Sequence, residues 1–243
     1  MGRGLEPRGA DYPGEVILGI DTSLGTTVAV VDADGAVRSE AVSANPLGHA
    51  EVIGTLLQSA IADAARGPIG ATIAPEPVEL THVAAGMGPG PFTGLRVGIA
   101  AARAFALGRG IPVVPVVSHD AVALELLLHD ALTGGFEDEA DDTFAVVTDA
   151  RRREFAYTVY RGLDDDGLPV RIAEPALSPR DELDSVLQAR GILRRDADRI
   201  SAAMIGVVAA RALAAGRTVG PADALYLRSP DVTMPGPPKR VVA

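Results

Sequence analysis

The chain has 243 residues, no cysteine and a formal net charge of -10 at neutral pH. This length suits one large domain or two small ones, and 47% hydrophobic with 22% charged residues is typical of an ordered globule. The lack of cysteine excludes disulfides, thiolate nucleophiles and cysteine-ligated metal centres. The acidic charge disfavours RNA binding by the chain alone, and the single lysine, Lys239, excludes lysine chemistry in the folded body.

The sequence also argues against a membrane protein. Its apolar runs all fall short of the roughly 20 residues that a membrane-spanning helix needs. Residues 1–14 hold arginines, acids, glycine and proline without an apolar stretch, which is unlike a secretory signal peptide. A cytoplasmic protein is therefore expected.

The first elements along the chain predict an antiparallel meander that is repeated later. In each copy an aspartate, Asp21 or Asp149, ends the first strand, and an Asp-Gly turn joins the second strand to the third. The repetition favours an internal duplication, although two unrelated hairpins with Asp-Gly turns would look alike. The strands are expected at 16–20, 26–31 and 36–42 in the first copy and at 144–147, 154–160 and 168–173 in the second.

Helices are predicted between and after the meanders. The segment 47–66 is apolar on two sides, so it has more than one surface to bury. In 94–108 small residues recur at every fourth position, which permits close approach of another backbone. Further helices are expected at 119–128, with Ser118 as its N-cap, at 180–189 and at 201–215, with buried strands at 83–85 and 111–117 and an acidic linker at 133–142.

Polar residues that follow the first strand of each meander are the candidates for chemistry. An Asp-Thr-Ser-x-Gly turn after a buried strand is how actin-like ATPases hold a nucleotide phosphate or magnesium. Asp21, Thr22 and Ser23, with Asp149 from the second copy, could form such a site. The alternative is that these side chains only cap their own turns.

Neither a metal centre nor a hydrolytic triad is predicted. The four histidines, at positions 49, 82, 119 and 129, are never three or four residues apart, so no helical metal-binding pair exists. A nucleophile-elbow sequence is also missing. We therefore expect no catalytic residue and no metal ligand.

Four segments carry a family resemblance. Residues 17–23 (ILGIDTS), 88–98 (GPGPFTGLRVG), 149–152 (DARR) and 225–228 (LYLR) resemble, in this order, the glycoprotease-like TsaB (YeaZ) family of bacterial tRNA threonylcarbamoyladenosine-biosynthesis proteins. The resemblance implies an α/β, actin-like (ASKHA, ribonuclease H-like) duplicated fold, with two similar domains that each hold a mixed sheet flanked by helices. The domains are expected at 15–112 and 113–231, with extensions at 1–14 and 232–243.

The resemblance also implies a function. TsaB proteins are non-catalytic partners of the paralogous transferase TsaD, required for N6-threonylcarbamoyladenosine in tRNA next to the anticodon, together with the ATPase TsaE. A heterodimer with the paralogue is implied, or a homodimer of the isolated chain, with tRNA bound only through the complex and ATP or ADP with magnesium at its interface. The alternative is a stand-alone actin-like ATPase or small-molecule kinase.

The family's dimer surface is built from helices of the first domain, and this assigns interface residues by resemblance. The family also has a Gly-rich strand before its penultimate helix, but no strand is predicted between Gly191 and Ile200. The implied interface consists of His49, Val52, Ile53, Leu56, Gly94, Leu95, Gly98, Ile99 and Ala102.

Overall fold

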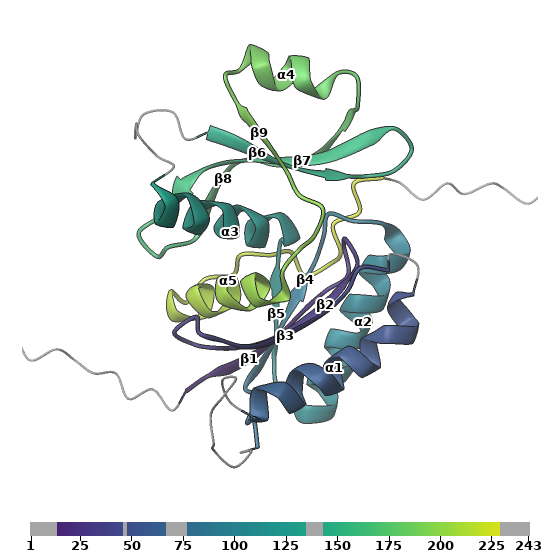
Figure 1. The fold of residues 1–243 in the computed structure, drawn as a ribbon, viewed down its shortest axis with the longest axis vertical. Coiled ribbons are helices and arrows are strands. Elements are labelled where there is room, and N and C mark those ends of the chain that lie inside the picture. Colours follow the sequence, from purple (N-terminus) through teal and green to yellow (C-terminus); the bar gives the residue numbers. More distant parts are fainter. Residues whose placement is uncertain (1–13, 46–47, 67–76, 135–142, 229–243) are drawn as a thin grey trace, which may run out of the picture.

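The computed structural model describes residues 14–45, 48–66, 77–134 and 143–228 and contains two β-sheets with helices between and outside them (Figure 1). Nearly all of the expected extension 1–14, the whole of the expected extension 232–243 and most of the linker at 133–142 lie outside the described residues. The elements are β1 Val16–Asp21, β2 Thr26–Asp32, β3 Val37–Ser43, α1 His49–Ala65, β4 His82–Gly86, α2 Phe92–Arg109, β5 Val113–Val116, α3 Ser118–Thr133, β6 Thr143–Asp149, β7 Glu154–Leu163, β8 Pro169–Pro179, α4 Leu183–Ala189, β9 Leu193–Asp196 and α5 Ala202–Ala214.

The two sheets repeat one arrangement, as the duplicated meander predicts. The first has the strand order β3-β2-β1-β4-β5 and the second β8-β7-β6-β9. In each, three consecutive strands are antiparallel, and the first strand of the meander also pairs in parallel with a later strand, β4 or β9. Asp21 and Asp149 therefore occupy equivalent positions, each at the end of the first meander strand of its sheet.

Strand β9 corrects one sequence expectation. Leu193–Asp196 pairs in parallel with residues 144–147 of β6, in the stretch where no strand was predicted. The strand is at the sheet edge and its four residues are exposed or only partly buried, so it needs no apolar run. Two of the four are arginines, which hides the strand from pattern analysis.

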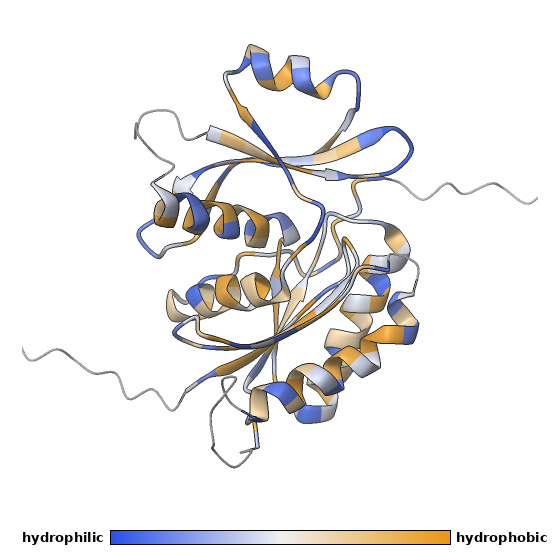
Figure 2. Ribbon diagram, in the orientation of Figure 1, coloured by the Kyte–Doolittle hydropathy of each residue, from blue (hydrophilic) through white to orange (hydrophobic). Residues whose placement is uncertain are grey.

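Helices cover both faces of the first sheet. On one face, α1 and α2 pack on Leu18, Ile20 and Val28. On the other, α5 approaches so closely that a Cβ on Gly19 would lie 2.1 Å from the carbonyl oxygen of Ala202. Figure 2 shows the apolar residues along the strands of this sheet and along α1 and α5.

Helices α3 and α5 form a layer between the two sheets, because residues of both helices share one hydrophobic cluster with both sheets. Strand β5 pairs with β4 in the first sheet, whereas the expected boundary at residue 112 assigns it to the second domain. Helix α5, late in the sequence, likewise packs on the first sheet.

Among the helices of the described ranges, none has the length and apolar character that crossing a membrane requires.

Candidate functional site

The first hairpin turn, residues 21–25, is closed by hydrogen bonds. Asp21 ends β1 with 2% of its surface exposed. Its carboxylate accepts hydrogen bonds from the backbone N–H of Ser23 at 2.7 Å and from the hydroxyl of Ser118 at 2.5 Å. The Ser23 hydroxyl also lies 3.0 Å from the Ser118 hydroxyl. Three side chains from two distant segments thus form one buried polar network.

A glycine at the end of β4 and another in the loop that follows it allow this closure. A Cβ on Gly86 would lie 1.9 Å from Asp21 Oδ2, and one on Gly90 would lie 2.9 Å from the Cα of Ser23. The loop therefore packs directly over the turn and excludes water from it. Burial raises the pKa of Asp21 to about 6, although hydrogen bonds from Ser118 and Ser23 act in the opposite direction.

Thr22 is equally enclosed. Its hydroxyl donates a hydrogen bond to the carbonyl oxygen of Gly94 at 2.7 Å, which joins the turn to the start of α2. Asp21, Thr22 and Ser23 are each at most 3% exposed. Sequence reasoning placed these three side chains at a nucleotide, but in this conformation none reaches a surface from which it could touch one.

Ser118 is a member of this network that sequence reasoning missed. It was predicted to be an N-cap, but Val117 holds the N-cap position of α3, and no side chain caps that helix. The Ser118 hydroxyl instead bonds Asp21 and accepts a hydrogen bond from the N–H of Gly88 at 3.0 Å. Because Ser118 and Asp21 are 97 residues apart, only the folded topology reveals their contact.

The second hairpin turn, residues 149–153, is exposed. The Asp149 side chain is 58% exposed, accepts a hydrogen bond from the N–H of Arg151 at 2.8 Å, and pairs with Arg180 at 2.6 Å. The hydrogen bond from Arg180 holds the pKa of Asp149 below its ordinary value. Sequence reasoning placed Asp149 and Asp21 in one site, but only Asp149 faces solvent.

Three consecutive arginines in the second hairpin turn have left-handed backbone conformations. Arg151, Arg152 and Arg153 have φ angles of 61°, 52° and 65°. Such angles cost L-residues about 1–2 kcal/mol each, and strained backbone persists where surrounding contacts hold it. All three residues are exposed, so the turn presents a row of cations in a conformation that the chain does not adopt without support.

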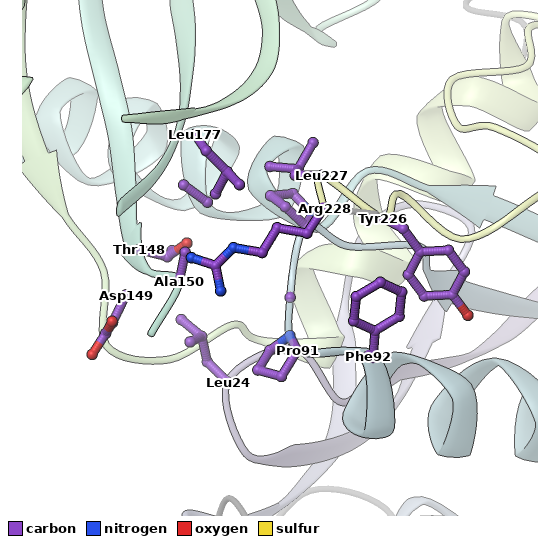
Figure 3. Close-up of a pocket in the computed structure, with 13 residues that line it drawn as sticks. Leu24, Pro91, Phe92, Thr148, Asp149, Ala150, Leu177, Tyr226, Leu227 and Arg228 are labelled. Carbon is purple, nitrogen blue, oxygen red and sulfur yellow. The ribbon is translucent and has the colours of Figure 1, made fainter. Parts of the chain in front are cut away.

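A C-terminal strap, residues 224–228, connects the two halves of the molecule. The Tyr226 ring stacks on Phe92 with centroids 4.5 Å apart, and the Arg96 guanidinium lies 5.6 Å from each ring centroid. Two residues further, Arg228 forms an ion pair with Glu154. Figure 3 shows the Tyr226 and Phe92 rings together and the Arg228 side chain reaching toward the end of β6.

The strap leaves a small cavity between the halves. Its volume is about 60 Å³, whereas pockets for small molecules measure about 300–1,000 Å³. A nucleotide therefore does not fit into this cleft as it stands. The cavity is lined by Leu24, Pro89, Gly90, Pro91, Phe92, Thr148, Asp149, Ala150, Ala156, Leu177, Tyr226, Leu227 and Arg228, most of which are labelled in Figure 3.

The small residues of α2 that the resemblance assigned to a partner interface face inward. Gly94, Leu95, Gly98, Ile99 and Ala102 are all buried within the chain. A Cβ on Gly98 would lie 2.1 Å from the Thr22 hydroxyl oxygen. The small residues therefore let α2 pack against its own domain, which corrects their assignment to the interface.

The α1 residues of that assignment divide into two groups. His49 and Ile53 are buried, and the His49 Nδ1 atom lies 2.8 Å from the Thr26 hydroxyl. Val52 and Leu56 are partly exposed, so they can contribute to an outer surface. The exposed positions of α2 include Ala100, Ala104 and Leu107, of which Leu107 is 84% exposed.

Other buried polar side chains form hydrogen bonds within the chain. The His119 ring nitrogens lie 2.7 Å and 3.0 Å from the hydroxyls of Thr158 and Thr148, and burial lowers the pKa of His119 to about 3. Burial raises the pKa of Asp120 to about 7, opposed by Arg171. In the described parts of the chain, no three His, Asp or Glu side chains are grouped to hold a metal ion.

The fold and the two equivalent turns define an actin-like protein with duplicated mixed sheets. Residues 41–175 match the model of the family described as "TsaD: tRNA N6-adenosine threonylcarbamoyltransferase". The chain therefore belongs to this family of tRNA-modification proteins. The motif resemblance to glycoprotease-like TsaB (YeaZ) proteins is confirmed by this match together with the fold.

The chain is also similar to solved structures, which share its fold, and to relatives from mycobacteria. YeaZ from Pseudomonas aeruginosa superposes with a TM-score of 0.63 at 21% identity, over 88% of this chain and all of YeaZ. An uncharacterized protein of Mycobacterium leprae is 39% identical over 171 residues, which are 68% of this chain. One from Mycobacterium tuberculosis is 36% identical over 69% of this chain. The matched region spans 40% of the M. leprae relative and 67% of the M. tuberculosis one.

Proposed function

We propose that this chain is a non-catalytic subunit that binds a TsaD-type transferase and is required for threonylcarbamoylation of tRNA. The observation that carries the proposal is the sealed first hairpin turn. Asp21, the residue best placed to hold a nucleotide-bound magnesium, is instead 2% exposed and hydrogen-bonded to Ser118 and Ser23. The 60 Å³ cavity beside it is too small for a nucleotide.

The outward faces of α1 and α2 are the surface proposed to bind the transferase. Small uncharged residues are exposed on both helices, among them Ala50, Gly54 and Thr55 on α1 and Ala100 and Ala104 on α2. Small residues permit close packing of a second pair of helices. The half-buried Val52 and Leu56 and the exposed Leu107 add apolar area toward the roughly 1,200–2,000 Å² that a stable interface buries in total.

Charge substitution on α2 tests this surface. Ala104→Asp with Leu107→Asp should lower co-purification of the transferase at least tenfold, because the interface would have to bury two unpaired carboxylates. The matched control is Ala131→Asp with Leu132→Asp on α3, where Leu132 is 87% exposed, against 84% for Leu107. Equal recovery of the transferase with both double variants would remove α2 from the interface.

The complex is also proposed to include the ATPase TsaE, with tRNA bound by the assembly. Modified tRNA should form in a reconstituted mixture of transferase, TsaE and this chain, and it should not form when this chain is left out. In the rival function, a stand-alone ATPase or kinase, Asp21 and Asp149 would act with magnesium. Titration of the isolated chain with ATP and magnesium separates the two, because micromolar binding with turnover would establish the rival.

A further inference from the structure

Arginines converge on an open groove beside the second hairpin turn. We call it the arginine groove, and its volume is about 940 Å³. Four arginines and two acids line it, which leaves a local excess of two positive charges on a chain whose net charge is -10. The lining residues are Arg152, Arg153, Glu154, Pro179, Arg180, Asp181 and Arg228.

A hydrogen bond within the turn and hydrogen bonds from two other segments hold the turn beside this groove in place. The Asp149 carboxylate accepts a hydrogen bond from the N–H of Arg151. The carbonyl oxygen of Arg153 accepts a hydrogen bond from the N–H of Arg180 at 3.0 Å, and the carbonyl oxygen of Arg151 accepts one from the Arg228 guanidinium at 3.3 Å. The left-handed turn is therefore fixed before any ligand binds.

The acids around the groove occupy some of its arginines and leave others exposed. Asp149 pairs with Arg180, and Glu154 pairs with Arg228. The side chains of Arg151 and Arg153 form no ion pair with any described residue, and both residues are exposed. Arg153 thus lines the groove with an exposed guanidinium group, and Arg151, also exposed, stands two residues before it on the same rigid turn.

We propose that the arginine groove binds the phosphodiester backbone of the RNA substrate while the transferase acts on it. The inference rests on the proposed function, which supplies an RNA ligand. Guanidinium groups bind phosphate oxygens in a bidentate manner. None of the described lining residues is aromatic, so the groove offers charge for a backbone but no ring for stacking a base.

The openness of the groove favours a polymer over a free nucleotide. An enclosed nucleotide site requires a pocket that buries most of the ligand, whereas the enclosed cavity next to the groove measures only about 60 Å³. An RNA backbone needs just an open path with cations along it. Contacts of this kind position the RNA and do not read its sequence.

Charge reversal in the reconstituted transferase tests the proposal. With Arg151→Glu and Arg153→Glu, the KM for an unmodified tRNA transcript should rise at least tenfold while kcat stays unchanged. Each lost phosphate contact lowers the slope of log affinity against log salt by about 0.7–0.9, so the loss of two contacts should lower this slope by about 1.4–1.8. Arg161→Glu with Arg190→Glu, at two exposed positions outside the groove, is the control and should change neither quantity.

Two further variants separate charge from structure. Arg151→Lys with Arg153→Lys keeps the charge and should keep KM within about threefold. Arg151→Gly with Arg153→Gly removes the charge but suits the left-handed turn, so it should raise KM without lowering the unfolding midpoint. An unchanged KM in the glycine and glutamate variants would overturn the proposal.

Two controls distinguish this inference from the function on which it rests. Co-purification of the transferase should be the same for the glutamate variant and the parent chain. Intact co-purification with an unchanged KM would overturn the groove assignment and leave the subunit role standing, whereas modification without this chain would refute that role itself. Displacement of tRNA by micromolar ADP, lost in the glutamate variant, would show a nucleotide site instead and overturn the RNA assignment.

Discussion

The two hairpin turns differ in almost every physical property although they occupy equivalent places in the duplicated fold. Asp21 is buried, lies under a glycine loop and bonds two hydroxyl-bearing residues. Asp149 is 58% exposed and pairs with Arg180. Burial raises the pKa of Asp21 to about 6, whereas the arginine lowers the pKa of Asp149. One residue type at one topological position therefore became a structural group in one half and a surface group in the other.

The difference fits the proposed role of a subunit that binds partners without catalysing the reaction. The first turn is filled by its own chain, since Gly86 and Gly90 admit the loop that covers it. The second has no such cover and carries three arginines instead. Under that proposal, the sealed first turn offers no nucleotide site, whereas the open second turn offers a place for an anionic ligand.

The largest expected effect is a pH-dependent one at the first turn. The pKa of Asp21 rises from its ordinary value of 3.8 to about 6 on folding. Between these values the native chain holds a proton that the unfolded chain releases, so stability falls as pH rises, by about 1.4 kcal/mol per unit. In the Asp21→Asn variant, position 21 has no carboxyl group and does not titrate. The variant's free energy of unfolding relative to the parent should therefore improve by about 2.4 kcal/mol between pH 4 and pH 7, as urea denaturation would measure.

Comparing the variant with the parent removes the contributions of other titrating groups from the measured difference. Asp120 and His119 are unchanged in both proteins, so their own contributions cancel in the difference. Asp149→Asn at the second turn is the matched control. In the parent chain the pKa of Asp149 is lowered, so its interaction with Arg180 is lost as pH falls. An exposed ion pair of this kind contributes at most about 1 kcal/mol to stability. A pH-independent difference for Asp21→Asn would show that Asp21 is hydrated in the native state.

Glycine substitution provides the next largest effect. A Cβ on Gly98 would lie 2.1 Å from the Thr22 hydroxyl oxygen, and Thr22 is itself buried and hydrogen-bonded to Gly94. Gly98→Ala should lower the free energy of unfolding by about 2 kcal/mol, because overpacking forces α2 away from the first turn. Thermal or urea unfolding of the isolated chain measures this change.

Gly54→Ala is the matched control for that substitution. It also changes a helical glycine, but nothing lies within 4 Å of the added Cβ. It should raise stability by about 0.5–1 kcal/mol, since alanine favours a helix over glycine. Equal effects at Gly98 and Gly54 would show that α2 does not pack tightly against the first turn.

Sequence patterns predicted the fold well wherever the elements have an apolar rhythm or a turn signal. The duplicated meander and most helices followed from buried runs, Asp-Gly turns and helical periodicity. Ser201, expected as the first residue of the helix at 201–215, is instead the N-cap of α5 and accepts a hydrogen bond from the N–H of Met204. The edge strand β9 was not predicted, because two of its four residues are arginines and it has no apolar periodicity. The hydrophobic pattern of a sequence indicates which residues are buried, so it does not predict an element that buries few residues.

The site was less predictable because it depends on contacts between distant segments. Nothing near Ser118 in the sequence indicates its bond to Asp21, and the small-residue ridge of α2 gives no sign of whether it faces its own domain or a partner. The left-handed backbone of Arg151 to Arg153 is also unexpected for arginine. These features arise from packing across the cleft, which a single sequence does not encode locally.

The smallest expected effect concerns the strain in the second turn. Arg153 has a φ angle of 65°, which glycine adopts freely. Arg153→Gly should raise the free energy of unfolding by about 0.5–1 kcal/mol, because relief of about 1–2 kcal/mol of strain exceeds the added chain entropy of glycine. Arg190→Gly, at an exposed position with a φ of -105°, should instead lower it. A gain in stability together with weaker RNA binding would show that the turn keeps its arginine for function at the expense of folding, whereas a loss of stability at both positions would show that contacts of Arg153 outweigh the strain.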